Sequence, residues 1–250
     1  MLLANHLALT FTFAMVIAHW TEPPIPNYLH ICEKLDQNLT ECLKTSIDKL
    51  RSVLIEGIPN VDIPSLDPLE IDNLFKFDRS HHGLHIKAEN VLVLGILKFN
   101  IDKLDVVKHG KQYDVDVVFP RLQVEGACDV SGQVKEFLVD EACSFVETFH
   151  NSSAKVKAHF SHVANGWLVQ TDKIDVKIKA SKGVVKLYDL SKGRRILDRY
   201  EIDNVINHNF NKMNKELFPV VEKVLQHQLK EMSNKVFGNF SYGQIFPISF

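Results

Sequence analysis

The residues best suited to chemistry are three neighbouring histidines, His81, His82 and His85, with Asp78 shortly before them. Imidazole nitrogens and carboxylates are common ligands of zinc and of other divalent metal ions. The cluster lacks an established ligand motif, however, and Gly83 within it favours an exposed turn between two strands. We therefore expect no metal site here and no bound cofactor.

Nucleophilic catalysis finds little support. Ser241 lies between Gly238 and Gly243, but this spacing differs from the G-x-S-x-G turn that exposes a catalytic serine. No H-E-x-x-H motif and no glycine loop that cradles phosphate is present. His159 and His162 would point to opposite faces of a strand, and the scattered acidic residues are typical of a solvated surface. We expect a protein that is not an enzyme.

The composition is that of an ordinary globular protein. The chain has 250 residues, of which 45% are hydrophobic and 24% are charged, and its net charge is −2. A chain of this length can bury a sizeable core. Its near-neutral charge argues against nucleic-acid binding, which depends on Lys and Arg side chains that neutralise phosphates. No segment has the length of a comfortable membrane span, so we expect no stable membrane insertion.

The N-terminal residues predict secretion. Residues 1–18 are apolar, and Val16-Ile17-Ala18 has the small-residue spacing of a signal-peptide cleavage site. The Lys or Arg that usually precedes the apolar stretch is missing, and an uncleaved anchor is the alternative. We predict a signal peptide over 1–18, a single domain over 19–250 and an extracellular location.

The cysteines and glycosylation motifs agree with that compartment. An even number of cysteines in a secreted chain suggests disulfides, and four allow three connectivities. Pairing of nearest neighbours is the economical expectation, and it joins Cys32 to Cys42 and Cys128 to Cys143. Three Asn-X-Ser/Thr motifs predict glycosylation, at Asn38, Asn151 and Asn239.

Hydrophobic spacing predicts one helix over 28–57 and a longer one over 202–240. Between them, alternating apolar and polar residues predict antiparallel strands, among them separate strands over 137–139, 145–149 and 156–163. Pro120 coincides with a change of phase, where a bulge or a strand break is expected. Pro219 should kink the second helix or split it.

These elements predict the fold class. No helices alternate with the strands, so we expect an α+β fold in which a highly curved antiparallel sheet wraps the long C-terminal helix, with an N-terminal helix beside it. Sixteen phenylalanines against two tryptophans indicate an aromatic interior with few polar groups. If the sheet wraps the helix incompletely, the interior holds a tunnel for an apolar ligand. A fully packed core is the alternative, and composition does not decide between them.

The proline-rich run from Gly57 to Asp72 resembles a hallmark of the insect takeout and haemolymph juvenile-hormone-binding protein family. The early cysteine pair, residues 95–104 and the closing segments with Phe218-Pro219 and Phe246-Pro247 are similar as well, so the resemblance covers essentially the whole mature chain. It implies a tubular lipid-binding-like fold whose apolar tunnel carries juvenile hormone or another long-chain lipid or terpenoid. It also implies a role in circadian, feeding or chemosensory physiology.

The second cysteine pair departs from this resemblance. Members of the takeout branch are usually described with only the N-terminal disulfide, whereas this chain adds Cys128 and Cys143. The added pair either braces a strand–turn–strand unit or stays reduced.

The expected ligand-binding residues are the inward stripes of the helices and strands. They are Ile47, Leu50, Leu54, Tyr113, Val115, Val117, Phe119, Phe145, Phe160, Trp167, Phe218, Val221 and Leu225. Tyr113 or Tyr188 would donate a hydrogen bond to an ester, epoxide or carbonyl oxygen of the ligand, and the sequence does not choose between them. We expect a monomeric secreted carrier of a small hydrophobic ligand. The alternative is a secreted signalling protein that acts through a receptor of unknown identity, with a purely structural core.

Overall fold

The structure is a computed structural model that describes residues 22–71, 84–107, 111–134, 137–163, 168–180, 183–189 and 200–248. Its elements are α1 (Leu39–Leu54), a short 3-10 helix (Pro59–Val61), β1 (Leu69–Ile71), β2 (Leu84–Leu94), β3 (Asn100–Val107), β4 (Gln112–Val134), β5 (Phe137–Val163), β6 (Leu168–Lys179), β7 (Gly183–Asp189), α2 (Tyr200–Phe237) and α3 (Tyr242–Ile245). The predicted signal peptide and the residues Asp78, His81, His82 and Trp167 lie outside the described residues.

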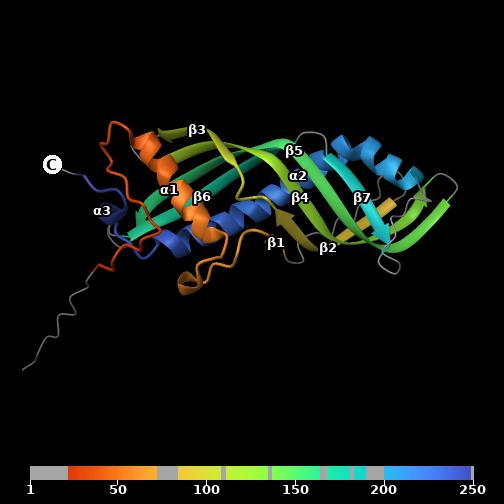
Figure 1. Cartoon of the computed structure of the whole chain (residues 1–250), viewed down its shortest axis with the longest axis horizontal. Coiled ribbons are helices and arrows are strands. Elements are labelled where there is room, and N and C mark those ends of the chain that lie inside the picture. The colour runs from red at the N-terminus through yellow and green to blue at the C-terminus, as the bar shows by residue number, and fades with distance from the viewer. Residues whose placement is uncertain are drawn as a thin grey trace, which may run out of the picture.

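The strands form one antiparallel sheet around the long central pair β4 and β5. Different halves of β4 pair with β2 and β3, different halves of β5 pair with β6 and β7, and β1 extends the sheet beyond β2. The sheet curls around α2, which runs along most of the long axis of the molecule, while α1 lies at one end (Figure 1). The predicted α+β fold is confirmed.

The register of β4 and β5 decides which side chains face the helix. Val117 is paired with Ala154, and both are buried. Further along, the inward pair is Val124 with Glu147. The inward residues thus change from odd to even numbers on β4 and from even to odd numbers on β5. The change falls where Pro120 lies opposite Asn151, whose φ is 52°. The phase change at Pro120 agrees with the prediction. Neither strand is interrupted, because both change phase at the same place, and the separate strands predicted within 137–163 are one strand.

Helix α1 begins later than predicted, at Leu39 instead of residue 28. The preceding residues form turns in which the backbone N–H of Asn38 donates to the Asp36 carboxylate at 2.8 Å. Such side-chain hydrogen bonds compete with helix formation. Leu35, which completed the apparent helical stripe, is 71% exposed. The segment is instead tied to the helix by the Cys32–Cys42 disulfide.

Helix α2 is continuous across Pro219, so of the two predicted outcomes the split is wrong and the kink stays a prediction. Proline removes one backbone hydrogen bond, which neighbouring contacts can offset. Four polar side chains of α2, on both sides of Pro219, hydrogen-bond to backbone groups of the edge strands β6 and β7. The pairs are Asn207 with Val185, Glu222 with Ile178, Gln226 with Val176 and Asn234 with Thr171.

Replacing Glu222 by alanine should destabilise the protein by roughly 2–3 kcal/mol, because the buried carboxylate accepts the Ile178 N–H at 2.9 Å and alanine leaves this donor without its partner. Lys177 also bonds this carboxylate, but its side chain is 75% exposed, so Lys177→Ala should cost less than about 1 kcal/mol. Urea unfolding at neutral pH measures both effects. Glu231→Ala, at an exposed position of the same helix, is the control. Equal effects of Glu222→Ala and Glu231→Ala would contradict the prediction.

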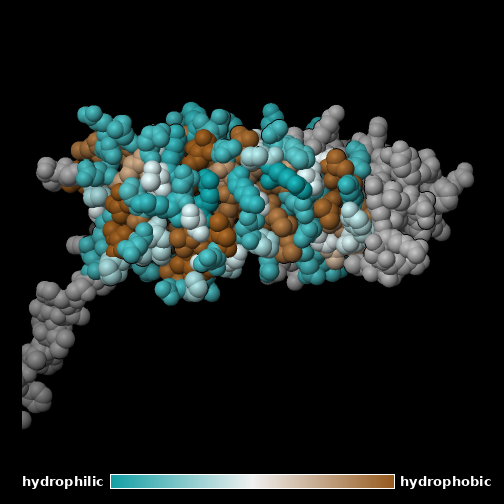
Figure 2. Space-filling view, viewed as in Figure 1, coloured by the Kyte–Doolittle hydropathy of each residue, from teal (hydrophilic) through white to brown (hydrophobic). Residues whose placement is uncertain are grey.

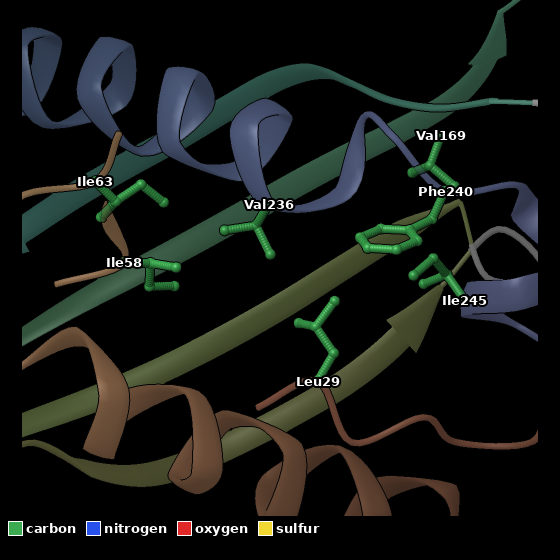
Figure 3. Packing of buried hydrophobic residues seen from close by; sticks show 7 residues of the cluster. All are labelled: Leu29, Ile58, Ile63, Val169, Val236, Phe240 and Ile245. Carbon is green, nitrogen blue, oxygen red and sulfur yellow. The ribbon is translucent and has the colours of Figure 1, made fainter. Parts of the chain in front are cut away.

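Many of the buried apolar residues of the described chain belong to one of two clusters. The end cluster contains Leu29, Ile58, Ile63, Val169, Val236, Phe240 and Ile245, whose side chains converge from the N-terminal arm, the loop after α1, β6, the end of α2 and α3 (Figure 3). The middle cluster contains Leu66, Leu69, Ile71, Val91, Leu97 and Val224. Leu54 and Met232 pack against both. Helix α1 therefore helps to connect the two clusters.

Candidate functional site

The candidate site is the interior between the concave face of the sheet and the facing stripe of α2. Phe145 of the sheet and Val221 and Leu225 of α2 pack against the middle cluster, yet each keeps part of its surface accessible. Among the described residues, the largest side chains that lose essentially all solvent contact are the valines Val169 and Val176. Two phenylalanines, Phe149 and Phe240, are buried as well, with 7% and 5% of their surface exposed. Apolar side chains of the sheet and of α2 therefore line one interior, and some of them keep accessible surface.

An aromatic group lies at the end of the interior near α3. The ring of Tyr113 stacks on Phe246 at 5.9 Å between centroids and meets Phe160 edge-on at 5.5 Å. Phe160 in turn contacts Phe237 edge-on at 6.4 Å. Burial, with a smaller contribution from Tyr242, raises the pKa of the Tyr113 hydroxyl. Tyr113 therefore keeps its proton and can donate a hydrogen bond at any physiological pH.

Tyr188, the other tyrosine considered as a donor, points the opposite way. It is paired with Ser144, whereas the adjacent pair of Leu187 with Phe145 contributes to the buried face. Successive residues of a strand face opposite sides of the sheet. Tyr188 therefore lies on the convex face, and Tyr113 is the better placed of the two for a ligand inside.

Most of the other predicted ligand-binding residues lie around the interior. Those that pack against one or both clusters are Leu50, Leu54, Phe145, Phe160, Val221 and Leu225. Val117 is buried, and alternation along β4 places Val115 and Phe119 on the same face. Ile47 and Phe218 are half-buried and belong to neither cluster. The contact of these residues with a ligand stays a prediction.

Sequence reasoning missed an acidic group on the concave face. Glu147 is 9% exposed, lies between Phe145 and Phe149 on the inward side of β5, and is paired with Val124 of β4. Its carboxylate has no hydrogen-bond or ion-pair partner among the described residues, and burial raises its pKa to about 8. The sequence did contain a signal for this position. Cys143, Phe145 and Phe149 form an apolar stripe of alternate residues, and Glu147 occupies the remaining position of that stripe.

Two further buried oxygen atoms lack a hydrogen-bond partner within the described part of the chain. They are the hydroxyl oxygen of Ser152 on β5 and the side-chain carbonyl oxygen of Gln228 on α2. Buried polar groups are normally paired in folded proteins, so each such atom requires an explanation. A bound molecule that supplies the missing partner is one explanation.

The cysteines form the two disulfides expected from nearest-neighbour pairing. Cys32 is bonded to Cys42, and Cys128 is bonded to Cys143, its direct register partner in the central strand pair. The side chain of His30 lies close to the first disulfide, so that these three residues offer atoms within 4.8 Å of one another. Since metal binding requires thiolates, disulfide-bonded sulfurs do not form such a site.

The surface gives less indication of function. On the face in Figure 2, apolar residues reach the surface in several patches with hydrophilic residues between them. The side chains of Asn38, Asn151 and Asn239, the predicted glycosylation sites, are exposed. None of the described helices combines the length and the apolar character needed to cross a membrane.

Comparison with known proteins places the chain in a family. The sequence profile of the haemolymph juvenile hormone binding protein family matches residues 7–247. The crystal structure of takeout 1 from Epiphyas postvittana is similar with a TM-score of 0.66 at 15% identity, over 88% of this chain and 100% of that chain. A crystal structure of lipopolysaccharide binding protein gives a TM-score of 0.43 at 13% identity, over 80% of this chain and 38% of that chain. No curated protein matches by sequence. The chain thus belongs to the haemolymph juvenile hormone binding protein family.

Proposed function

We propose that the protein is a secreted, non-enzymatic carrier that binds a small hydrophobic ligand between the concave face of the sheet and α2. Family and fold together indicate a carrier of hydrophobic ligands. The observation that carries the proposal is the apolar lining between the sheet and α2, in which inward side chains such as Phe145 and Leu225 keep accessible surface. Juvenile hormone or another long-chain lipid or terpenoid fits such a site.

The driving force would be the removal of apolar ligand surface from water. At about 25 cal/mol per Å², burying about 400 Å² of a lipid would contribute about 10 kcal/mol before the cost of association. With an association cost of about 4 kcal/mol, about 6 kcal/mol would remain, which corresponds to a Kd of tens of micromolar, and a larger buried ligand surface would tighten it. The protein needs no catalytic group for this task, because its action is to shield the ligand and release it.

Secretion as a monomeric single domain is part of the same proposal. The two disulfides favour an oxidising compartment, and the signal peptide expected over 1–18 would direct the chain there. Roles in circadian, feeding or chemosensory signalling rest on the family resemblance. The alternative, a signalling protein with a purely structural core that acts on a receptor, accounts less well for inward apolar side chains that keep accessible surface.

Purification from a eukaryotic secretory host tests the carrier function. We expect native mass spectrometry of the secreted protein to show a co-purifying lipid, or the delipidated protein to bind the apolar fluorescent probe N-phenyl-1-naphthylamine saturably with one site. The reduced and unfolded protein is the control and should show no saturable binding. A folded protein that neither carries lipid nor binds the probe would contradict the proposal.

A further inference from the structure

Glu147 occupies a defined place in the interior, away from the aromatic group around Tyr113. Its register partner on β7 is Val185, whose backbone is held by Asn207 near the beginning of α2. Tyr113 is paired with Ala158, which lies eleven residues after Glu147 on β5. This separation corresponds to about 35 Å of extended strand. The apolar middle cluster packs against Phe145, two residues from Glu147. A chain-like ligand with its polar end at Glu147 would therefore have apolar wall along its length.

The described sheet residues around Glu147 offer its carboxyl group no polar partner. The side chains that face it on the sheet are Phe145 and Phe149 on its own strand, Val124 on β4 and Val185 on β7, and none of them carries a polar group. Burying a carboxyl group without a hydrogen-bond partner costs stability. Since a leucine at this position would avoid that cost, the acid requires a compensating role.

The protonation state decides which ligands such a group would suit. Burial raises the pKa of Glu147 to about 8, so the carboxyl is mostly neutral at pH 7. A neutral carboxyl donates one hydrogen bond from its O–H and accepts others at its carbonyl oxygen. It would pair with an uncharged oxygen-bearing group without the desolvation cost of an ion.

We propose that Glu147 recognises the polar head group of the ligand, which makes the ligand an amphiphile with a hydroxyl, carbonyl or ester oxygen at one end rather than a plain hydrocarbon. This inference rests on the proposed carrier function and adds the chemical class of the ligand. It also assigns an orientation, with the head group at Glu147 and the chain extending along α2 toward the middle cluster.

The test compares ligands that share one chain and differ in the head group. Displacement of N-phenyl-1-naphthylamine at pH 7 gives the affinities of the delipidated protein for n-dodecane, n-dodecanol and n-dodecylamine. We expect Glu147→Leu to weaken the binding of dodecanol by about tenfold and to leave dodecane binding unchanged or tighter. Glu147→Gln, which keeps a donor and an acceptor, should retain most of the dodecanol affinity, and it remains informative if the leucine variant does not fold.

A matched control lies on the neighbouring strand. Glu125 of β4 follows the inward Val124, so it faces the convex side, where its carboxylate accepts a hydrogen bond from Gln123. Glu125→Leu makes the same chemical change outside the interior. It should leave the affinities for dodecane and dodecanol unchanged, so the same loss of dodecanol binding in this variant would overturn the inference.

The remaining outcomes separate the inference from the carrier function. If the wild-type protein binds none of the ligands or the probe, the carrier function itself fails. If the wild type binds them, and Glu147→Leu weakens the binding of dodecane and dodecanol equally or leaves both affinities unchanged, the inference is overturned and the carrier function stands. Selective loss of dodecanol binding in Gln228→Leu instead of Glu147→Leu would place the head group elsewhere. Preference for dodecylamine that both Glu147 variants abolish would show an ionised carboxylate and overturn the neutral head group.

Discussion

The stability of the ligand-free protein should fall by about 1.4 kcal/mol per pH unit between pH 4.5 and about 8 through Glu147 alone. Burial raises the pKa of this carboxyl from 4.5 to about 8, so in that range the folded protein binds more protons than the unfolded chain. Rising pH removes a proton that only the folded state holds, and this favours unfolding. Below pH 4.5 both states are protonated and the effect disappears.

Urea unfolding of the wild type and of Glu147→Gln at a series of pH values isolates this effect from other titrating groups. The two proteins should have similar free energies of unfolding near pH 4.5, and the variant should be more stable by about 4 kcal/mol at pH 8. Parallel pH profiles would show that the carboxyl ionises normally in the folded protein. They would also weaken the case that it meets a ligand as a neutral acid.

A tryptophan at Val221 should abolish most ligand binding with little effect on folding. Val221 lies on the inward stripe of α2, half-buried against the middle cluster. An indole ring there would displace about 100 Å² of bound ligand surface, which costs about 2.5 kcal/mol or close to a hundredfold in Kd. An interior that accepts a ligand, as proposed, has room for the ring. Probe titration and urea unfolding measure the two effects separately.

The neighbouring residue provides the control for this variant. Val220 is 43% exposed on the outer side of the same helix, so Val220→Trp should change neither binding nor stability appreciably. In a fully packed core, Val221→Trp would instead cost about 1–3 kcal/mol through overpacking. Such destabilisation, combined with probe binding that remains at the wild-type level, would contradict an interior that accepts a ligand.

Much of the fold follows from local periodicity. Alternation predicted the strands of the sheet, and the helical spacing after residue 200 predicted α2, because each pattern reflects one buried face. The predictions that failed are those in which the local sequence pattern conflicts with contacts to residues far away in the sequence. Pro219 suggested a kinked or split helix, but α2 is not split, and side chains such as Glu222 bond it to a strand far away in the sequence. Leu35 extended a helical stripe by coincidence.

The candidate site was predictable in its apolar part only. Phe145, Val221 and Leu225 belong to stripes that periodicity detects, and the structure places them around one interior. Glu147 was assigned to the solvated surface with the other acidic residues, since acidic residues are rarely buried without a partner. Its position became evident only from the register of β5 with β4, which places it between two phenylalanines on the concave face.

The side chains of α2 that bond to β6 and β7 also determine how the sheet meets other molecules. An uncovered edge strand presents free N–H and C=O groups, to which a strand of another protein can add and start aggregation. Here Asn234 and Glu222 occupy N–H groups of β6, and Asn207 occupies both backbone groups of Val185 on β7. The helix therefore shields this margin of the sheet against edge-to-edge association. The hydrogen bonds that join α2 to the sheet would therefore also disfavour aggregation through these strands.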